Sequence, residues 1–205
     1  MGTYAASRRQ GEEGVSIAEE IKAIGRATAI DLILGYACDA LGDRAAAEVN
    51  IGASATLARK MGDKARLSFA LNVLAGHYVE IGNLDVAEPL FEEALALARE
   101  GNDHESIALG CANLARVVIE RVDAQRAQAP LAEGVVIARE IGSTRGGQDA
   151  IEVSAGLAVL RGEWAMAARF SGALQRLMEE ARAPPLAGRR CVLRDEDREG
   201  GLGTG

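Results

Sequence analysis

Only two histidines, His77 and His104, could supply imidazole chemistry in this chain of 205 residues. A zinc or general-base site needs partners at fixed spacing, such as two histidines four residues apart on one helix face. The two histidines fall on different predicted helices, and neither belongs to such a motif. We expect His77, beside Tyr78, to lie on a helix surface or in a groove, without a metal or catalytic role.

Paired acidic residues are the second candidates for chemistry: Glu12-Glu13, Glu92-Glu93 and Glu179-Glu180. Adjacent residues on a helix point about 100° apart, so such pairs are poorly placed for two-carboxylate catalysis. They are typical of solvated helix faces. No phosphate-binding glycine loop precedes a helix either. The sequence therefore predicts a protein that is not an enzyme and needs no cofactor.

The three cysteines are Cys38, Cys111 and Cys191, an odd number without CxxC spacing. Neither a disulfide framework nor a zinc site is indicated. Cys38 and Cys111 occupy apolar positions of the repeat described below, so we expect both to be small buried hydrophobic residues.

The formal net charge is −7 and the isoelectric point is near 5.0. Direct nucleic-acid binding would need a basic patch, which this balance disfavours. No apolar run approaches the roughly 18 residues of a membrane span, and the first residues lack the apolar core of a signal peptide. We expect a cytoplasmic protein without a membrane partner.

The elements that carry these residues repeat every forty residues. One column is alanine in four successive copies, at positions 47, 87, 127 and 167. Another column is apolar in five copies, at positions 17, 57, 97, 137 and 177. A fixed period of this length is the signature of a solenoid built from identical units.

Each unit reads as two amphipathic helices. In the best copy, apolar residues recur at helical spacing over 64–81 and again over 84–100. Asp63 is placed to cap the first helix and Gly82 to end it. Two helices of about 27 Å joined by so short a turn must fold back antiparallel. The unit is a helical hairpin.

The register predicts an all-α fold: a right-handed α-solenoid of antiparallel hairpins with about nine helices. Pro130 should kink or break its helix, and Gly146-Gly147 should delay or loosen the start of the last hairpin. The segment 13–21 matches 133–141, so residues 4–22 are either the second half of a truncated repeat or an N-terminal cap. The predicted parts are an orphan helix at 4–22, hairpins at 24–60, 64–100, 104–140 and 146–182, and a disordered tail at 183–205.

The second hairpin resembles the tetratricopeptide repeat (TPR). It has the large, small and aromatic residues of that repeat at matching spacings: Leu71, Leu74, Ala75, Tyr78, Gly82, Ala87, Phe91 and Ala94. The forty-residue period exceeds the family's usual 34. With this longer period, the chain resembles the long-repeat branch of the family, which is found in MalT-like and LuxR-type transcription activators and signal-transduction ATPases.

The resemblance implies that ligands lie against a concave wall built from the first helix of each hairpin. The exposed wall positions in that register include Tyr36, Phe69, Asn72, Val79, Leu109, Arg116 and Ile119. The alternative is that several of them pack between neighbouring helices. The lysine and asparagine pattern of the family's carboxylate clamp is missing from the wall.

These expectations combine into a non-catalytic protein-interaction or regulatory scaffold that binds a peptide or a partner domain in its concave groove. The alternative is a small-ligand-sensing segment of a bacterial transcription regulator or signal-transduction ATPase.

Overall fold

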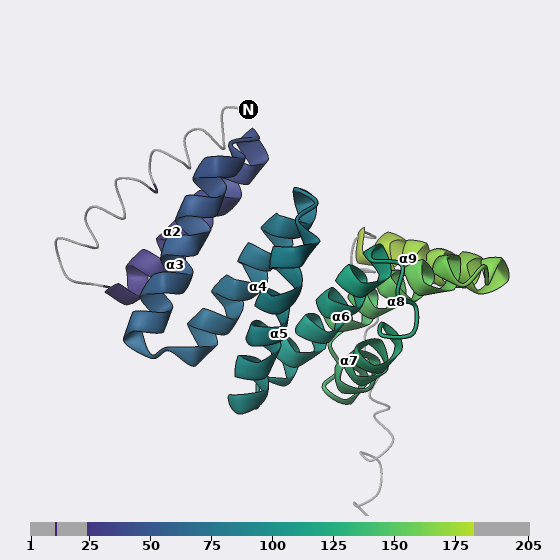
Figure 1. Cartoon of the computed structure of the whole chain (residues 1–205). Helices are drawn as coiled ribbons and strands as arrows, with labels where there is room; N and C mark the ends of the chain where they lie inside the picture. The colour runs from purple at the N-terminus through teal and green to yellow at the C-terminus, as the bar shows by residue number, and fades with distance from the viewer. Residues whose placement is uncertain (1–10, 12–23, 183–205) are drawn as a thin grey trace, which may run out of the picture.

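The computed structural model describes residue 11 and residues 24–182, and these residues form helices without a strand. Figure 1 shows the helices following one another from purple to yellow along the molecule. The eight helices of residues 24–182 are α2 (Ile24–Leu41), α3 (Arg44–Met61), α4 (Lys64–Glu80), α5 (Leu84–Glu100), α6 (His104–Glu120), α7 (Gln128–Glu140), α8 (Thr144–Leu160) and α9 (Trp164–Arg182). The expected orphan helix at 4–22 lies outside the described residues except for Gly11, and so does the expected tail at 183–205.

Each odd-numbered helix packs most extensively against the helix before it, so the chain is a stack of hairpins. The first helices α2, α4, α6 and α8 also contact one another in succession. Among the described residues, the backbones of the second helices α3, α5, α7 and α9 do not approach one another in this way, and only long side chains reach between them. A stack whose first helices lie closer together than its second helices must curve with the first helices on the inside. The all-α, TPR-like solenoid predicted from the sequence is therefore the observed fold.

Local signals set the helix ends. The carboxylates of Asp43, Asp63 and Asp103 each accept a hydrogen bond from the backbone N–H three residues later, which satisfies one of the free donors of the first turn. Gly82 closes α4 with φ of 77°, a conformation in which a side chain would be strained. The predicted cap and stop of the second hairpin are confirmed.

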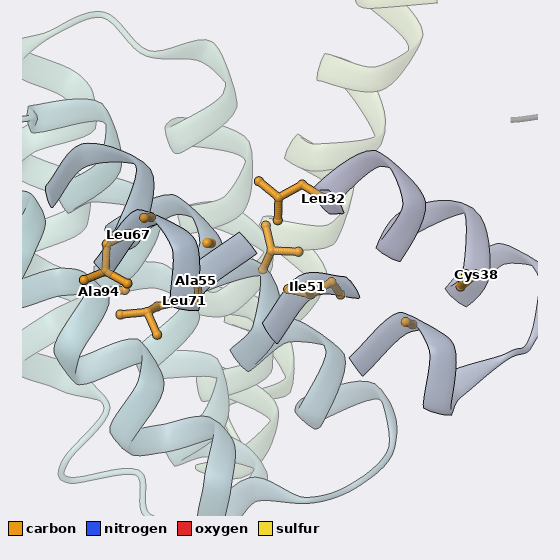
Figure 2. Close-up of a cluster of buried hydrophobic side chains, with 11 residues drawn as sticks. Leu32, Cys38, Ile51, Ala55, Leu67, Leu71 and Ala94 are labelled. Atoms are coloured by element: carbon orange, nitrogen blue, oxygen red, sulfur yellow. The ribbon is translucent and has the colours of Figure 1, made fainter. Parts of the chain in front are cut away.

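Small residues allow the helices to cross closely. Ala47, Ala87 and Ala127 are completely buried, so a side chain larger than a methyl group has no room there. Figure 2 shows the cluster of the first two hairpins, in which Leu32, Ile51 and Leu71 fill the space that these crossings leave. Cys38 and Cys111 are buried among apolar neighbours, as predicted.

Two local predictions were wrong. Pro130 does not kink a helix, because α7 begins only at Gln128 and so places Pro130 in a first turn, where no intrahelical N–H is required. Gly146 and Gly147 do not delay the last hairpin: α8 begins at Thr144, where Ser143 caps it by accepting from the Gly146 N–H at 2.9 Å.

Exposed ion pairs connect successive hairpins at spacings close to the repeat period. Arg59 binds Glu93 at 2.5 Å and Arg99 binds Glu133 at 2.7 Å, at equivalent positions one repeat apart. Each such surface pair contributes at most about 1 kcal/mol, so the buried alanine and leucine columns hold the stack together. Among the residues that the structure describes, no helix combines the length and hydrophobicity that a bilayer crossing requires.

Candidate functional site

A cavity of about 270 Å³ opens on the inner wall, where α2, α4 and α6 run side by side. Phe91 of α5, itself buried, lines it from the second layer of helices. The other lining residues are Tyr36, Asp39, Asn72, Val73, Gly76, His77, Val79, Glu80, Asn113 and Arg116. We call this hollow the central cavity.

Gly76 creates the hollow. It shares one repeat column with Tyr36 and Arg116, which stand on the neighbouring first helices. A Cβ atom added at Gly76 would meet nothing within 4 Å, so the space between the tyrosine and the arginine is open. The backbone of α4 is therefore accessible between two large side chains.

Two amides lie together in the cavity wall. The Nδ2 atom of Asn113 on α6 donates to Oδ1 of Asn72 on α4 at 2.9 Å. Both side chains are partly buried, and this bond uses one of the two donors of Asn113 and one lone pair of the Asn72 carbonyl. The other N–H groups and carbonyl lone pairs of the two amides complement the C=O and N–H of a peptide group.

A polar cluster forms the other side of the cavity. His77 Nδ1 lies 2.9 Å from Oδ1 of Asp39, and Arg44 Nη1 donates to the same oxygen at 2.9 Å and to Glu80 Oε2 at 2.7 Å. His77 is 3% exposed and lines the cavity, so of the two predicted positions, helix surface or groove, the structure shows the groove. Its ring reaches across to the partly buried carboxylate of Asp39 on α2.

Electrostatics also connect the two ends of the inner wall. Burial raises the pKa of the Tyr36 hydroxyl, the Arg145 guanidinium on α8 lowers it, and Asp39 raises it. Burial likewise raises the pKa of Asp149, against the lowering influence of Arg145 and Arg116. Arg145 of α8 thus influences titrating groups on both α2 and α8.

The predicted wall residues separate into three groups. Tyr36, Asn72, Val79 and Arg116 line the central cavity. Phe69 and Leu109 lie with Asn72 around a neighbouring crevice between α4 and α6.

Ile119 instead packs against a buried cluster of α6, α7 and α8. This is the alternative stated for the wall positions, that some of them pack between neighbouring helices. The structure thus brings four of the seven predicted residues into one hollow.

The cavity also contains residues outside the seven predicted wall positions, among them His77 and Asn113. His77 shares its column with Ala37, Val117 and Leu157, all of which are buried, so the register itself could have predicted its burial. Asn113 was overlooked because the forty-residue register aligns Asn72 with Ala112, the buried residue that precedes Asn113. A shift of one residue rotates a side chain by about 100° around the helix, and an alignment at a fixed period does not detect such a shift.

Within the described ranges, no three His, Cys, Asp or Glu side chains gather in a way that could hold a metal ion. Arg116 Nη2 lies 3.7 Å from Glu152 Oε1, and its charge is balanced on the α8 side. The arrangement offers hydrogen bonds, an aromatic ring and an open backbone. These are the means of recognising a segment of chain.

Comparison with solved structures identifies the fold. BtubC (BKLC) from P. vanneervenii superposes with a TM-score of 0.64 at 18% identity, covering 89% of this chain and 80% of that one. A crystal structure of nearly identical TPR-like repeats from Podosopora anserina gives a TM-score of 0.58 at 17% identity, over 89% of this chain and 96% of that one.

A third similar structure is a Rap protein complexed with Competence and Sporulation Factor, with a TM-score of 0.62 at 13% identity. The match covers 87% of this chain but only 59% of the Rap chain. No protein-family model matches the sequence, and no curated protein matches it. The similarity is therefore one of fold: this chain is folded as TPR-like repeat proteins are.

Proposed function

We propose that the chain is a non-catalytic interaction module that binds an extended segment of a partner protein along its inner wall. The observation that carries this proposal is the Asn72–Asn113 pair beside the open backbone of Gly76. An extended segment needs partners for its backbone N–H and C=O groups when it leaves water. Two facing amides supply both kinds of partner without regard to the side chains of the segment.

The dimensions of the groove favour a segment over a small molecule. Pockets for drug-sized ligands usually enclose about 300–1,000 Å³ and bury most of the ligand. The central cavity, at about 270 Å³, falls just below that range, and it shares Asn72 with the crevice at Phe69 and Leu109. Openings along successive first helices suit an extended chain, whose side chains alternate in direction.

The fold comparisons support the same class of function. Solved structures with this fold include repeat arrays and a Rap protein in complex with a factor. The forty-residue period supports, as a narrower proposal, a place among the long-repeat regulatory arrays of bacterial transcription regulators and signal-transduction ATPases. A small-ligand sensor of that group is the alternative, and the following experiment distinguishes it.

The test is selection of a phage-displayed library of random dodecapeptides on the immobilised protein. Binding of the enriched peptides is then measured by fluorescence anisotropy. We expect enriched peptides whose affinity falls about tenfold or more, about 1.4 kcal/mol, when Asn72 and Asn113 are both changed to alanine. The matched control is Asn102→Ala, an exposed asparagine in the turn after α5, which should leave binding unchanged.

Absence of any enriched peptide would contradict the proposal and favour the small-ligand alternative. Equal binding by the double variant would exclude the asparagine pair as the site.

A further inference from the structure

We infer that the central cavity selects a lysine or arginine side chain of the bound segment, which it seats against His77, Asp39 and Glu80. This inference rests on the proposed function and adds the chemistry that would make binding selective. Three observations carry it: a buried imidazole atom without a partner, an excess of carboxylate, and a half-exposed aromatic ring at the same hollow.

The first observation concerns the imidazole. The Nε2 atom of His77 is buried and has no hydrogen-bond partner among the described residues, although His77 lines the cavity. Its other ring nitrogen, Nδ1, lies 2.9 Å from the carboxylate of Asp39, which can only accept a hydrogen bond, so Nδ1 carries the ring proton. Nε2 then presents a lone pair. A buried polar atom without a partner is costly, so a hydrogen-bond donor from the segment gains by meeting it.

The second observation is the balance of charge. Two carboxylates, Asp39 and Glu80, share the single guanidinium of Arg44, which leaves one negative charge in excess on this side of the cavity. Arg116, the cation that lines the cavity, stands on α6 and faces Glu152. An acidic segment side chain would therefore be repelled at the α2 and α4 side, whereas a basic one is attracted.

The third observation is the ring of Tyr36. It lines the cavity and is 53% exposed, so its face is open to the occupant. A cation within about 6 Å of a tyrosine ring gains cation–π attraction. A neutral donor such as serine would satisfy His77 but would use neither the ring nor the excess charge. A basic side chain uses all three.

The test measures coupling between the protein and the dodecapeptides enriched by phage selection. The basic residue of an enriched peptide is changed to glutamine, and binding is measured against the wild type, Glu80→Gln and Glu120→Gln. Glu80 is 59% exposed at its side chain, so its neutral variant retains the fold. Glu120 is exposed and occupies the equivalent position one repeat later, outside the cavity lining, which makes it a matched control.

We expect the peptide change to weaken binding about tenfold in the wild type and in Glu120→Gln, but only about two- to threefold in Glu80→Gln. His77→Phe, which keeps a ring but removes Nε2, should reduce the effect in the same way. Circular dichroism confirms that each variant is folded.

Two outcomes overturn the inference. If enriched peptides depend on Asn72 and Asn113 but show no basic residue at any aligned position, the inference fails while the proposed function stands. If the peptide change weakens binding to Glu80→Gln and to Glu120→Gln by the same factor, the inference also fails. If no peptide is enriched, both the inference and the proposed function fail.

Discussion

His77 on α4 and Asp39 on α2 form a partly buried pair, with Nδ1 2.9 Å from Oδ1 across the interface of two hairpins. Because the imidazole is almost completely buried, removal of the carboxylate leaves a polar ring atom without its partner. We predict that Asp39→Ala lowers the free energy of unfolding by about 1–3 kcal/mol, measured by urea denaturation. Asp39→Asn, which retains an acceptor oxygen, should cost less.

The control for this prediction is Glu120→Ala, an exposed change on α6 that should stay within about 0.5 kcal/mol. Equal unfolding midpoints for Asp39→Ala and Glu120→Ala would show that the pair does not stabilise the fold.

Gly76 and Gly35 both lie inside helices, yet we predict opposite effects of alanine at the two positions. At Gly76 a methyl group meets open space, so alanine should raise the free energy of unfolding by about 0.5–1 kcal/mol through helix propensity. At Gly35 the new Cβ would lie 2.3 Å from Cγ1 of the buried Ile51, and overpacking should cost about 1–3 kcal/mol. Thermal melting followed by circular dichroism measures both. Melting temperatures that shift in the same direction would contradict the packing described here.

Ala87 tests the alanine column. It is completely buried at the crossing of α4 and α5, so Ala87→Arg must force a charge into a close contact and should destabilise the chain by several kcal/mol. Ala96, which is exposed on the same helix, provides the control: Ala96→Arg should change the melting temperature little. An unchanged melting temperature for Ala87→Arg would disprove the register.

The hydroxyl of Tyr78 donates to Glu48 Oε1 at 2.7 Å, and this hydrogen bond, with burial, raises its pKa from 10.0 to about 12. The folded protein therefore holds the phenolic proton more tightly than the unfolded chain. The resulting stability is present below about pH 10 and is lost as the pH rises toward 12.

The measurement is an ultraviolet titration of phenolate, in which the curve of Tyr78→Phe is subtracted from that of the wild type. We expect a midpoint near 12, which Glu48→Gln should lower. A midpoint near 10 in the wild type would contradict the hydrogen bond.

Much of the fold was predictable because one physical pattern repeats. Positions such as Ala47, Ala87 and Ala127 must be small wherever two helices cross, so their recurrence along the chain is enough to reveal the hairpins. Asp63 and Gly82 likewise act within one turn of chain, which makes them readable from sequence. Pro130 was misread because its effect depends on where α7 begins, and that is set by the turn preceding the helix.

The candidate site was predictable only in part, because it depends on how each helix is rotated and on contacts between different repeats. Asn72 and Arg116 were identified as wall residues because the register places both on the exposed face of a first helix. The pairing of His77 with Asp39 joins residues 38 apart along the chain, and no local pattern connects them. The one available signal was the buried column that His77 shares with Val117.

The central claim, that the hollow at Gly76 holds the bound segment, is tested most directly by filling it. Gly76→Leu places a side chain in the open space between Tyr36 and Arg116, whereas Gly52→Leu adds the same side chain on α3, where a Cβ also meets nothing within 4 Å. Binding of a selected dodecapeptide is measured by fluorescence anisotropy for both variants. We predict that Gly76→Leu weakens binding about tenfold or more while Gly52→Leu binds within about twofold of the wild type. Equal affinities for the two variants would contradict the account.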